Sequence, residues 1–202
     1  MADTAPANVV IDLETGLAAL SASPHLAGGR IALRAPREGD IDALHALFSD
    51  PAVMRYWSRP PLADRSEAEA MYRRFEDGFA TREALTWTTV TPDDALVGTC
   101  TLFRFEPRHR RAEIGYALRS DLWGRGLARE ALTLLLDWAF TALRLHRIEA
   151  DVDPRNDSSR QLLLRLGFRS EGLLRERYFV GDEVTDTELF GLLASDWTSA
   201  LP

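Results

Sequence analysis

The segment WGRGLAREAL (residues 123–132) has the residue types and spacing of an anion-binding turn. Gly124 and Gly126 would let the backbone approach a ligand closely, because neither carries a Cβ atom. The apolar residues that follow recur at helical spacing, and the first amides of a helix lack internal acceptors at the positive end of its dipole. Arg125 and Arg129 add positive charge. Spacing alone leaves two interpretations open, a phosphate-binding loop or a glycine-eased turn that binds nothing.

Two familiar phosphate-binding loops are excluded for this segment. The sequence contains no G-x-x-x-x-G-K-S/T motif. The dinucleotide-binding motif G-x-G-x-x-G lacks its third glycine here, because Ala128 and Arg129 follow the glycine pair. An anion site in this segment would therefore be of another kind.

The composition limits the class of protein. Acidic residues outnumber basic ones by 31 to 24, a formal net charge of −7, which argues against nucleic acid as the main partner. Cys100 is the single cysteine, so no intramolecular disulfide can form and a reducing compartment is expected. No apolar run is long enough to cross a bilayer, and Asp3 stands where a secretory signal would carry basic residues. We therefore expect a cytoplasmic protein with no membrane partner.

Hydrophobic periodicity predicts the elements that must position the glycine turn. Residues 1–28 are expected to form an N-terminal arm, and residues 29–202 a single folded domain. Asp40 is the expected N-cap of one helix, and Ser66 with Glu69 forms a capping-box signature for the next. The order of elements predicts a mixed sheet with helices on its faces. The predicted strands cover residues 30–35, 86–90, 96–105, 112–119, 146–153, 168–180 and 183–193, and the predicted helices cover residues 41–48, about 66–79, 127–143 and about 158–166.

The glycine turn and its surroundings resemble the acyl-CoA pyrophosphate loop of the GNAT acetyltransferase superfamily, whose pattern is (Gln or Arg)-x-x-Gly-x-(Gly or Ala). Gly126 and Ala128 match, and Trp123 departs from the first position in the way that is usual in the RimJ/RimL-like branch. RRAEIGYAL before the turn, and LHRIEADVDPRNDSSRQLLLRLGF and EGLLRE after it, resemble the same branch in the same order. The resemblance covers the chain from about Arg30 to Leu193.

The resemblance implies the GNAT fold, an α/β (α+β) architecture with helices on both faces. Its mixed, mostly antiparallel central sheet is splayed between two parallel strands, here residues 112–119 and 146–153. Acetyl-CoA would lie between these strands as cosubstrate, with its pantetheine arm paired to the backbone around Leu118 and Arg119. Asn156 would contact its polar amide groups. By the same resemblance, its pyrophosphate would meet the amides of Gly124, Arg125, Gly126, Leu127, Ala128 and Arg129.

The implied reaction is direct attack of an amine on the thioester, without a covalent enzyme intermediate. Glu113 would accept the proton of the amine, or would instead form an ordinary ion pair with Arg110 or Arg111. Ser159 would donate a proton to the leaving thiolate, or would only be a first-turn serine of a helix. Tyr178 is a rival acid, although an aromatic side chain at such a position more often packs.

Other reactive residue types indicate no chemistry. Cys100 lies in a core-like alternation and is interpreted as a packing residue. The 4 histidines are scattered without the spacing of metal ligands, so no metal is expected.

The resemblance implies acetyl-CoA as the cosubstrate but leaves several acceptors open. The acceptor is expected to be a primary amine, first of all the α-amine of a protein or peptide N terminus. A small amine such as a polyamine, an amino acid or an antibiotic is the alternative, and a non-catalytic acyl-CoA-binding module is a third hypothesis. Trp57 and Arg59 would border the acceptor cleft. The N-terminal arm could bridge two subunits of a homodimer.

Overall fold

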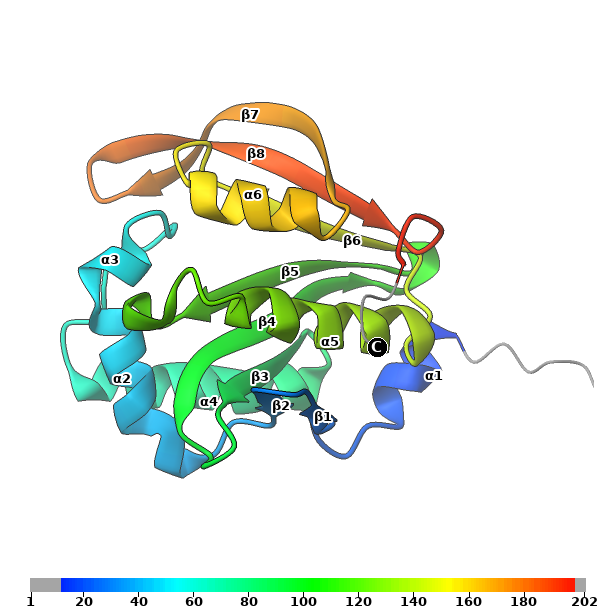
Figure 1. Cartoon of the computed structure of the whole chain (residues 1–202), viewed down its shortest axis with the longest axis horizontal. Helices are drawn as coiled ribbons and strands as arrows, with labels where there is room; N and C mark the ends of the chain where they lie inside the picture. The colour runs from blue at the N-terminus through cyan, green and yellow to red at the C-terminus, as the bar shows by residue number, and fades with distance from the viewer. Residues whose placement is uncertain (1–11, 199–202) are drawn as a thin grey trace, which may run out of the picture.

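The computed structural model describes residues 12–198, and these form one eight-stranded sheet surrounded by helices (Figure 1). The predicted mixed α/β fold with helices on both faces is confirmed. The helices are α1 Leu13–Ala18, α2 Ile41–Ser49, α3 Pro51–Met54, α4 Arg65–Thr81, α5 Leu127–Thr141 and α6 Asp157–Arg165, with short 3₁₀ turns η1 Glu38–Asp40, η2 Pro107–His109 and η3 Ser120–Leu122. The strands are β1 Leu26–Ala27, β2 Ala32–Arg34, β3 Ala84–Val90, β4 Leu96–Glu106, β5 Arg111–Leu118, β6 Arg147–Val152, β7 Arg169–Val180 and β8 Glu183–Leu193.

The strand order is β1-β2-β3-β4-β5-β6-β8-β7. Neighbouring strands are antiparallel except β5 and β6, which pair in parallel. The two predicted hairpins, β3–β4 and β7–β8, are both present. The last strand, however, lies between β6 and β7, an order that sequence periodicity does not reveal. This insertion makes β7 the outer strand and brings the C-terminal hairpin beside β6.

The parallel pair is short, and this opens the sheet. Its register runs from Arg111 opposite Arg147 to Glu113 opposite Glu149, and no pair follows. On the other side of β5, the antiparallel pairing with β4 continues as far as Leu118. Strands β5 and β6 therefore diverge beyond Glu113, as the resemblance predicted, and leave a gap in the middle of the sheet.

Side-chain caps fix where the helices begin, and they correct two predictions. The N-cap of α4 is Asp64, whose carboxylate accepts hydrogen bonds from the amides of Ser66 and Glu67, so the predicted capping box at Ser66 is wrong. Asp40 does precede α2, but its carboxylate makes no helix cap. It is buried and binds the Arg34 guanidinium at 2.8 Å, because two buried opposite charges must pair to offset their lost hydration.

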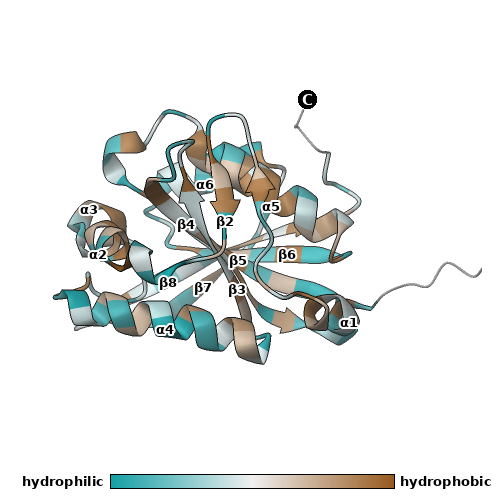
Figure 2. Cartoon of the chain, turned by 90° about the horizontal axis from the view of Figure 1, so that it is seen from below, coloured by the Kyte–Doolittle hydropathy of each residue, from teal (hydrophilic) through white to brown (hydrophobic). Residues whose placement is uncertain are grey.

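Two apolar clusters hold the helices to opposite faces of the sheet (Figure 2). The larger cluster joins α5 and α6 to the face that carries Cys100, Ala112 and Ile148. The smaller one joins α2, α3 and α4 to Leu96 and Ala117 on the other face. Alternation along each strand places every second side chain on each of these faces, so the two clusters fix which side chains turn towards which helices.

Residues 12–28 pack against the domain. Leu13 and Leu17 of α1 are buried in the larger cluster, and β1 pairs with β2. Residues 1–11 of the predicted arm lie outside the described residues. Within residues 12–198, no helix is both long enough and apolar enough to cross a membrane.

Cys100 is expected to stay unreactive in the folded protein. It is buried, and burial raises the pKa of its thiol to about 12, so almost none of it is thiolate at pH 8. A disulfide-exchange reagent should label no protein thiol in the native state and one after denaturation. Native labelling at the rate of the unfolded chain would contradict this burial.

Candidate active site

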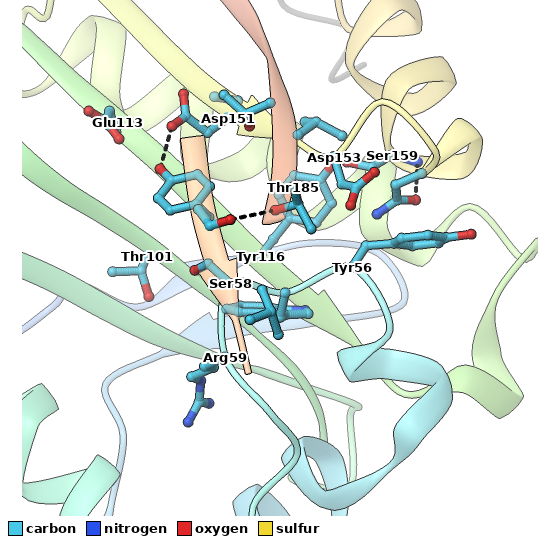
Figure 3. A pocket seen from close by; sticks show the side chains of 18 of the residues that line it. Tyr56, Ser58, Arg59, Thr101, Glu113, Tyr116, Asp151, Asp153, Ser159 and Thr185 are labelled. Atoms are coloured by element: carbon cyan, nitrogen blue, oxygen red, sulfur yellow. Dashed lines mark hydrogen bonds between the residues drawn. The ribbon is translucent and has the colours of Figure 1, made fainter. Parts of the chain in front are cut away.

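A cavity of about 610 Å³ lies where β5 and β6 diverge. Strands of both halves of the sheet contribute to it, and the segment 55–59 and α4 border it from the smaller-cluster side (Figure 3). Its polar and charged lining residues are Arg55, Tyr56, Ser58, Arg59, Arg74, Thr99, Thr101, Arg104, Glu113, Tyr116, Asp151, Asp153, Arg155, Asn156, Ser159, Tyr178, Glu183, Thr185, Asp186 and Thr187. Side chains far apart in the sequence thus meet at the gap in the sheet.

The glycine turn has the backbone geometry of an anion site. Gly124 and Gly126 have φ values of +75° and +77°, in the left-handed region that side chains with a Cβ atom rarely adopt. The turn leads into α5, a long helix, and the amides of residues 124–129 donate to no acceptor among residues 12–198. These amides form one continuous group of unpaired donors at the positive end of the α5 dipole.

Arg30, which precedes β2, braces this turn from outside. Its guanidinium donates to the carbonyl oxygen of Arg125 at 2.8 Å and to the Glu130 carboxylate at 2.7 Å. Glu130 also accepts from the Arg30 amide, and these bonds hold the pKa of its carboxyl below the usual range, although burial raises it. These bonds tie the turn to the segment before β2 and to the first turns of α5.

The predicted pantetheine segment is placed beside the turn. Leu118 is the last residue of β5, and its carbonyl oxygen accepts a hydrogen bond from the Trp123 indole at 2.8 Å. The Arg119 amide donates to Val97 of β4. The glycine turn and the end of β5 are therefore tied together, but residues 118–129 do not line the cavity.

Asn156 and Ser159 meet at the start of α6, at the rim of the cavity. The Asn156 side-chain oxygen accepts from the Ser159 amide at 3.1 Å, so Asn156 is the N-cap and Ser159 lies in the first turn. The Ser159 hydroxyl is 2.6 Å from the Tyr116 hydroxyl, and either oxygen can donate. Burial raises the pKa of Tyr116 to about 12, so this phenol keeps its proton at neutral pH.

Glu113 lines the cavity but is already paired. Both of its carboxylate oxygens accept hydrogen bonds from Arg104 of β4, at 2.9 and 3.1 Å. The sequence suggested Arg110 or Arg111 as the ion-pair partner, and that expectation is wrong, because Arg111 binds Glu149 instead. Arg104 is reachable because the β4–β5 register shifts between Phe103 and Glu106.

Asp151 of β6 and Tyr178 of β7 form a second polar pair in the cavity. The phenol donates to the Asp151 carboxylate at 2.7 Å, and burial, followed by this hydrogen bond, raises the pKa of Tyr178. Among the described residues, Asp151 has no ion-pair partner. Asp151 was not among the residues predicted from the sequence, although the alternation of β6 does turn it away from buried Ala150 and Val152.

The structure thus brings Glu113, Asn156, Ser159 and Tyr178 to one cavity, and adds Tyr116 and Asp151. The glycine turn stands apart from it, at the start of α5. No group of three or more His, Cys, Asp or Glu side chains able to hold a metal ion occurs within the described range. One end of the site offers unpaired amides for an anion, and the other offers a carboxylate and hydroxyl groups for proton transfer, which is the equipment of a group-transfer enzyme.

Comparison with known proteins identifies the class. Residues 30–169 match the family model of the acetyltransferase (GNAT) domain. The chain is 37% identical to the uncharacterized N-acetyltransferase p20 of Bacillus licheniformis, over 83% of this chain and 95% of that protein. The arrangement of strands around a splayed parallel pair, together with these matches, defines an N-acetyltransferase. The chain belongs to the GNAT acetyltransferase family.

Two solved structures show the same fold with CoA bound. Mycobacterium smegmatis RimJ in complex with CoA-disulfide superimposes with a TM-score of 0.77 at 27% identity, covering 86% of this chain and 88% of that one. Spermidine N-acetyltransferase from Vibrio cholerae, in complex with CoA and spermine, gives 0.74 at 27% identity, covering 84% and 98%. The similarity therefore extends to a solved complex that holds both CoA and a polyamine.

Proposed function

We propose that this chain transfers the acetyl group of acetyl-CoA to a primary amine, and that the α-amine of a peptide or protein N terminus is the first acceptor to test. The observation that carries the proposal is the pairing of two features across one gap in the sheet. Unpaired amides of residues 124–129 lie at the start of α5, and an unpaired carboxylate, Asp151, lies in the cavity between β5 and β6. The likeness to RimJ supports the acceptor class.

The residues present fit acetyl-CoA. Its pyrophosphate is an anion, and the amides of residues 124–129 are donors without acceptors within the described part of the chain. Leu118 and Arg119 lie beside that turn, and Asn156 lines the cavity with an amide nitrogen that the helix cap does not use. When bound, acetyl-CoA supplies an activated thioester carbonyl to the gap.

On the acceptor side, the amine must lose a proton before or during attack. We assign this proton to Asp151, because its carboxylate is bonded only to a neutral phenol and can also attract an ammonium group. Glu113, the base expected from the sequence, is the second candidate. Both of its carboxylate oxygens are bound to Arg104, so Glu113 would serve only after that ion pair opens.

On the donor side, the carbon–sulfur bond breaks and the departing thiolate takes up a proton. Ser159 is proposed as the donor, and Tyr116 as the positioning residue that replaces the proton through their 2.6 Å contact. The raised pKa of Tyr116 keeps this pair protonated throughout the neutral range.

Ser159→Ala is expected to lower kcat about 100-fold while leaving the KM for acetyl-CoA nearly unchanged. Tyr116→Phe should lower kcat less, because it acts through Ser159. Steady-state thiol release measures both, and Ser158→Ala, an exposed neighbour on the same helix, is the matched control. Full activity in both variants would contradict the assignment.

The proposal itself is tested by thiol release from acetyl-CoA across a panel of peptides, amino acids and polyamines. The buried Cys100 adds no background to this readout. The chain contains no lysine, so transfer of labelled acetate to a lysine-bearing protein cannot be confused with acetylation of its own lysines. Saturable acetyl-CoA binding with no turnover on any amine would instead support a non-catalytic module.

A further inference from the structure

The charged side chains of the cavity divide into paired and unpaired groups. Arg104 is bound to Glu113, and Arg155 is bound to Asp153 and Glu183. Arg104 and Glu113 balance each other, whereas Arg155 and its two carboxylates leave one net negative charge. The charged side chains that form no such ion pair determine which charges the cavity can offer to an acceptor.

Arg55, Arg59 and Arg74 line the cavity and form no ion pair among the described residues, and of the three only Arg59 is half-buried. Its guanidinium lies 5.1 Å from the ring centre of Phe48 and 5.9 Å from that of Trp57, and its other polar contact is the Met71 sulfur at 4.0 Å. Within residues 12–198, no carboxylate or carbonyl oxygen accepts a hydrogen bond from it. The planar group is half-buried on aromatic faces, with its donors unused by oxygen.

A second guanidinium strengthens this field. Arg74 of α4 lines the same cavity and has no ion-pair partner among the described residues. Burial lowers the pKa of Arg59, the charge of Arg74 lowers it further, and the charge of Glu67 opposes this shift. An arginine remains charged at neutral pH even so. The Glu67 carboxylate is bonded to the Ala63 amide, and neither arginine has an ion-pair partner among the described residues, so the two guanidinium groups favour an anion in the cavity that both line.

The negative group lies elsewhere in the cavity. Asp151 and Arg59 occupy opposite sides of the site in Figure 3, with the Tyr178 phenol bonded to Asp151. An acceptor with one positive group fits Asp151, whereas a second positive group towards segment 55–59 would meet Arg59 and Arg74. The cavity is therefore matched to a molecule with separated charges of opposite sign.

We propose that Arg59, supported by Arg74, binds a carboxylate carried by the acceptor while Asp151 receives its amine. The substrate class is then a primary amine bearing a carboxylate, supplied either by a free amino acid or dipeptide or by a peptide with an acidic residue near its N terminus. Polyamines are poor acceptors. This inference rests on the proposed acetyl transfer and adds the recognition of the acceptor.

The test compares acceptors that differ only in the carboxylate. One arm pairs a free amino acid with its amide, and the other pairs N-terminal peptides with Glu or Gln at the second position. Spermidine, which has three amine groups and no carboxylate, serves as the polycationic probe. Each is assayed by thiol release with the native chain and with Arg59→Gln, Arg59→Glu and Arg73→Gln, the last an exposed arginine of α4 outside the cavity.

The native chain and the Arg73→Gln control should prefer the carboxylate-bearing member of a pair. The arm in which this preference is seen shows whether the carboxylate comes from a free small molecule or from the side chain of a peptide. Arg59→Gln should lower kcat/KM for that member about 10- to 100-fold and leave its neutral partner within about twofold. Arg59→Glu should reverse the preference and raise spermidine turnover. Equal use of both members by native and variant chains would overturn the carboxylate site alone. Acetyl-CoA binding without turnover of any amine would instead overturn the proposed function.

Discussion

Gly126→Val is expected to lower the affinity for CoA on the order of 100-fold or more. Gly126 has a φ of +77°, and a β-branched residue is strained there by about 1–3 kcal/mol. A Cβ atom there would also stand 3.5 Å from the Arg30 guanidinium that braces the turn, so a larger side chain would disturb the backbone whose amides are proposed to bind the pyrophosphate. Calorimetric titration with CoA measures the loss.

Thermal unfolding of the free chain must accompany this titration, because strain at residue 126 also acts on the fold. Gly172→Val is the matched control. Gly172 lies in β7 with open space where a Cβ atom would stand, and its φ is not in the left-handed region. That variant should bind CoA like the native chain. Native affinity in a folded Gly126→Val chain would show that the pyrophosphate does not approach this turn.

Asp151→Asn is expected to lower kcat/KM for the amine about 100- to 10,000-fold, since it removes the proposed proton acceptor. The exchange keeps the shape of the side chain and a possible hydrogen bond to Tyr178, so the effect should fall on chemistry rather than on folding. CoA affinity should not change. Steady-state kinetics together with CoA titration separate these quantities.

Two further variants test whether the effect is specific to Asp151. Asp42→Asn removes an exposed carboxylate that pairs with Arg65 outside the cavity, and it should leave kcat/KM unchanged. Glu113→Gln should cost less than Asp151→Asn, because Glu113 is occupied by Arg104. If Glu113→Gln lowered kcat/KM more than Asp151→Asn did, Glu113 would be the base, as the sequence predicted.

Local sequence patterns were enough to predict most of the secondary structure and about half of the residues of the candidate site. The glycine turn could be predicted because its proposed role depends on backbone geometry. Gly124 and Gly126 are visible in the sequence, and both adopt the positive φ values that glycine favours. The boundaries of α5 and of the two hairpins followed from periodicity in the same way. Asn156 and Ser159 lie within one helical turn of each other, so their proximity was also local.

The remainder depends on contacts between distant segments. Tyr178 reaches Asp151 only because β8 inserts beside β6 and carries β7 with it, and no periodicity encodes that order. Arg104 reaches Glu113 because of an irregularity in the β4–β5 register. The capping-box signature at Ser66 failed for a simpler reason, because the neighbouring Asp64 is also a strong cap and lies where the helix begins.

The position of β8 also sets an order of assembly. It pairs with β6 on one side and with β7 on the other, so β7 has no sheet neighbour until β8 is in place. Since a chain is synthesised from its N terminus, the glycine turn and α5 emerge well before the wall that carries Tyr178 and Thr185 can form. Strand β8 also supplies Phe190 and Leu192 to the larger cluster that holds α5, so the support of the glycine turn and the wall of the cavity are completed together. The proposed acetyl transfer therefore becomes possible only when the last strand, β8, has joined the sheet.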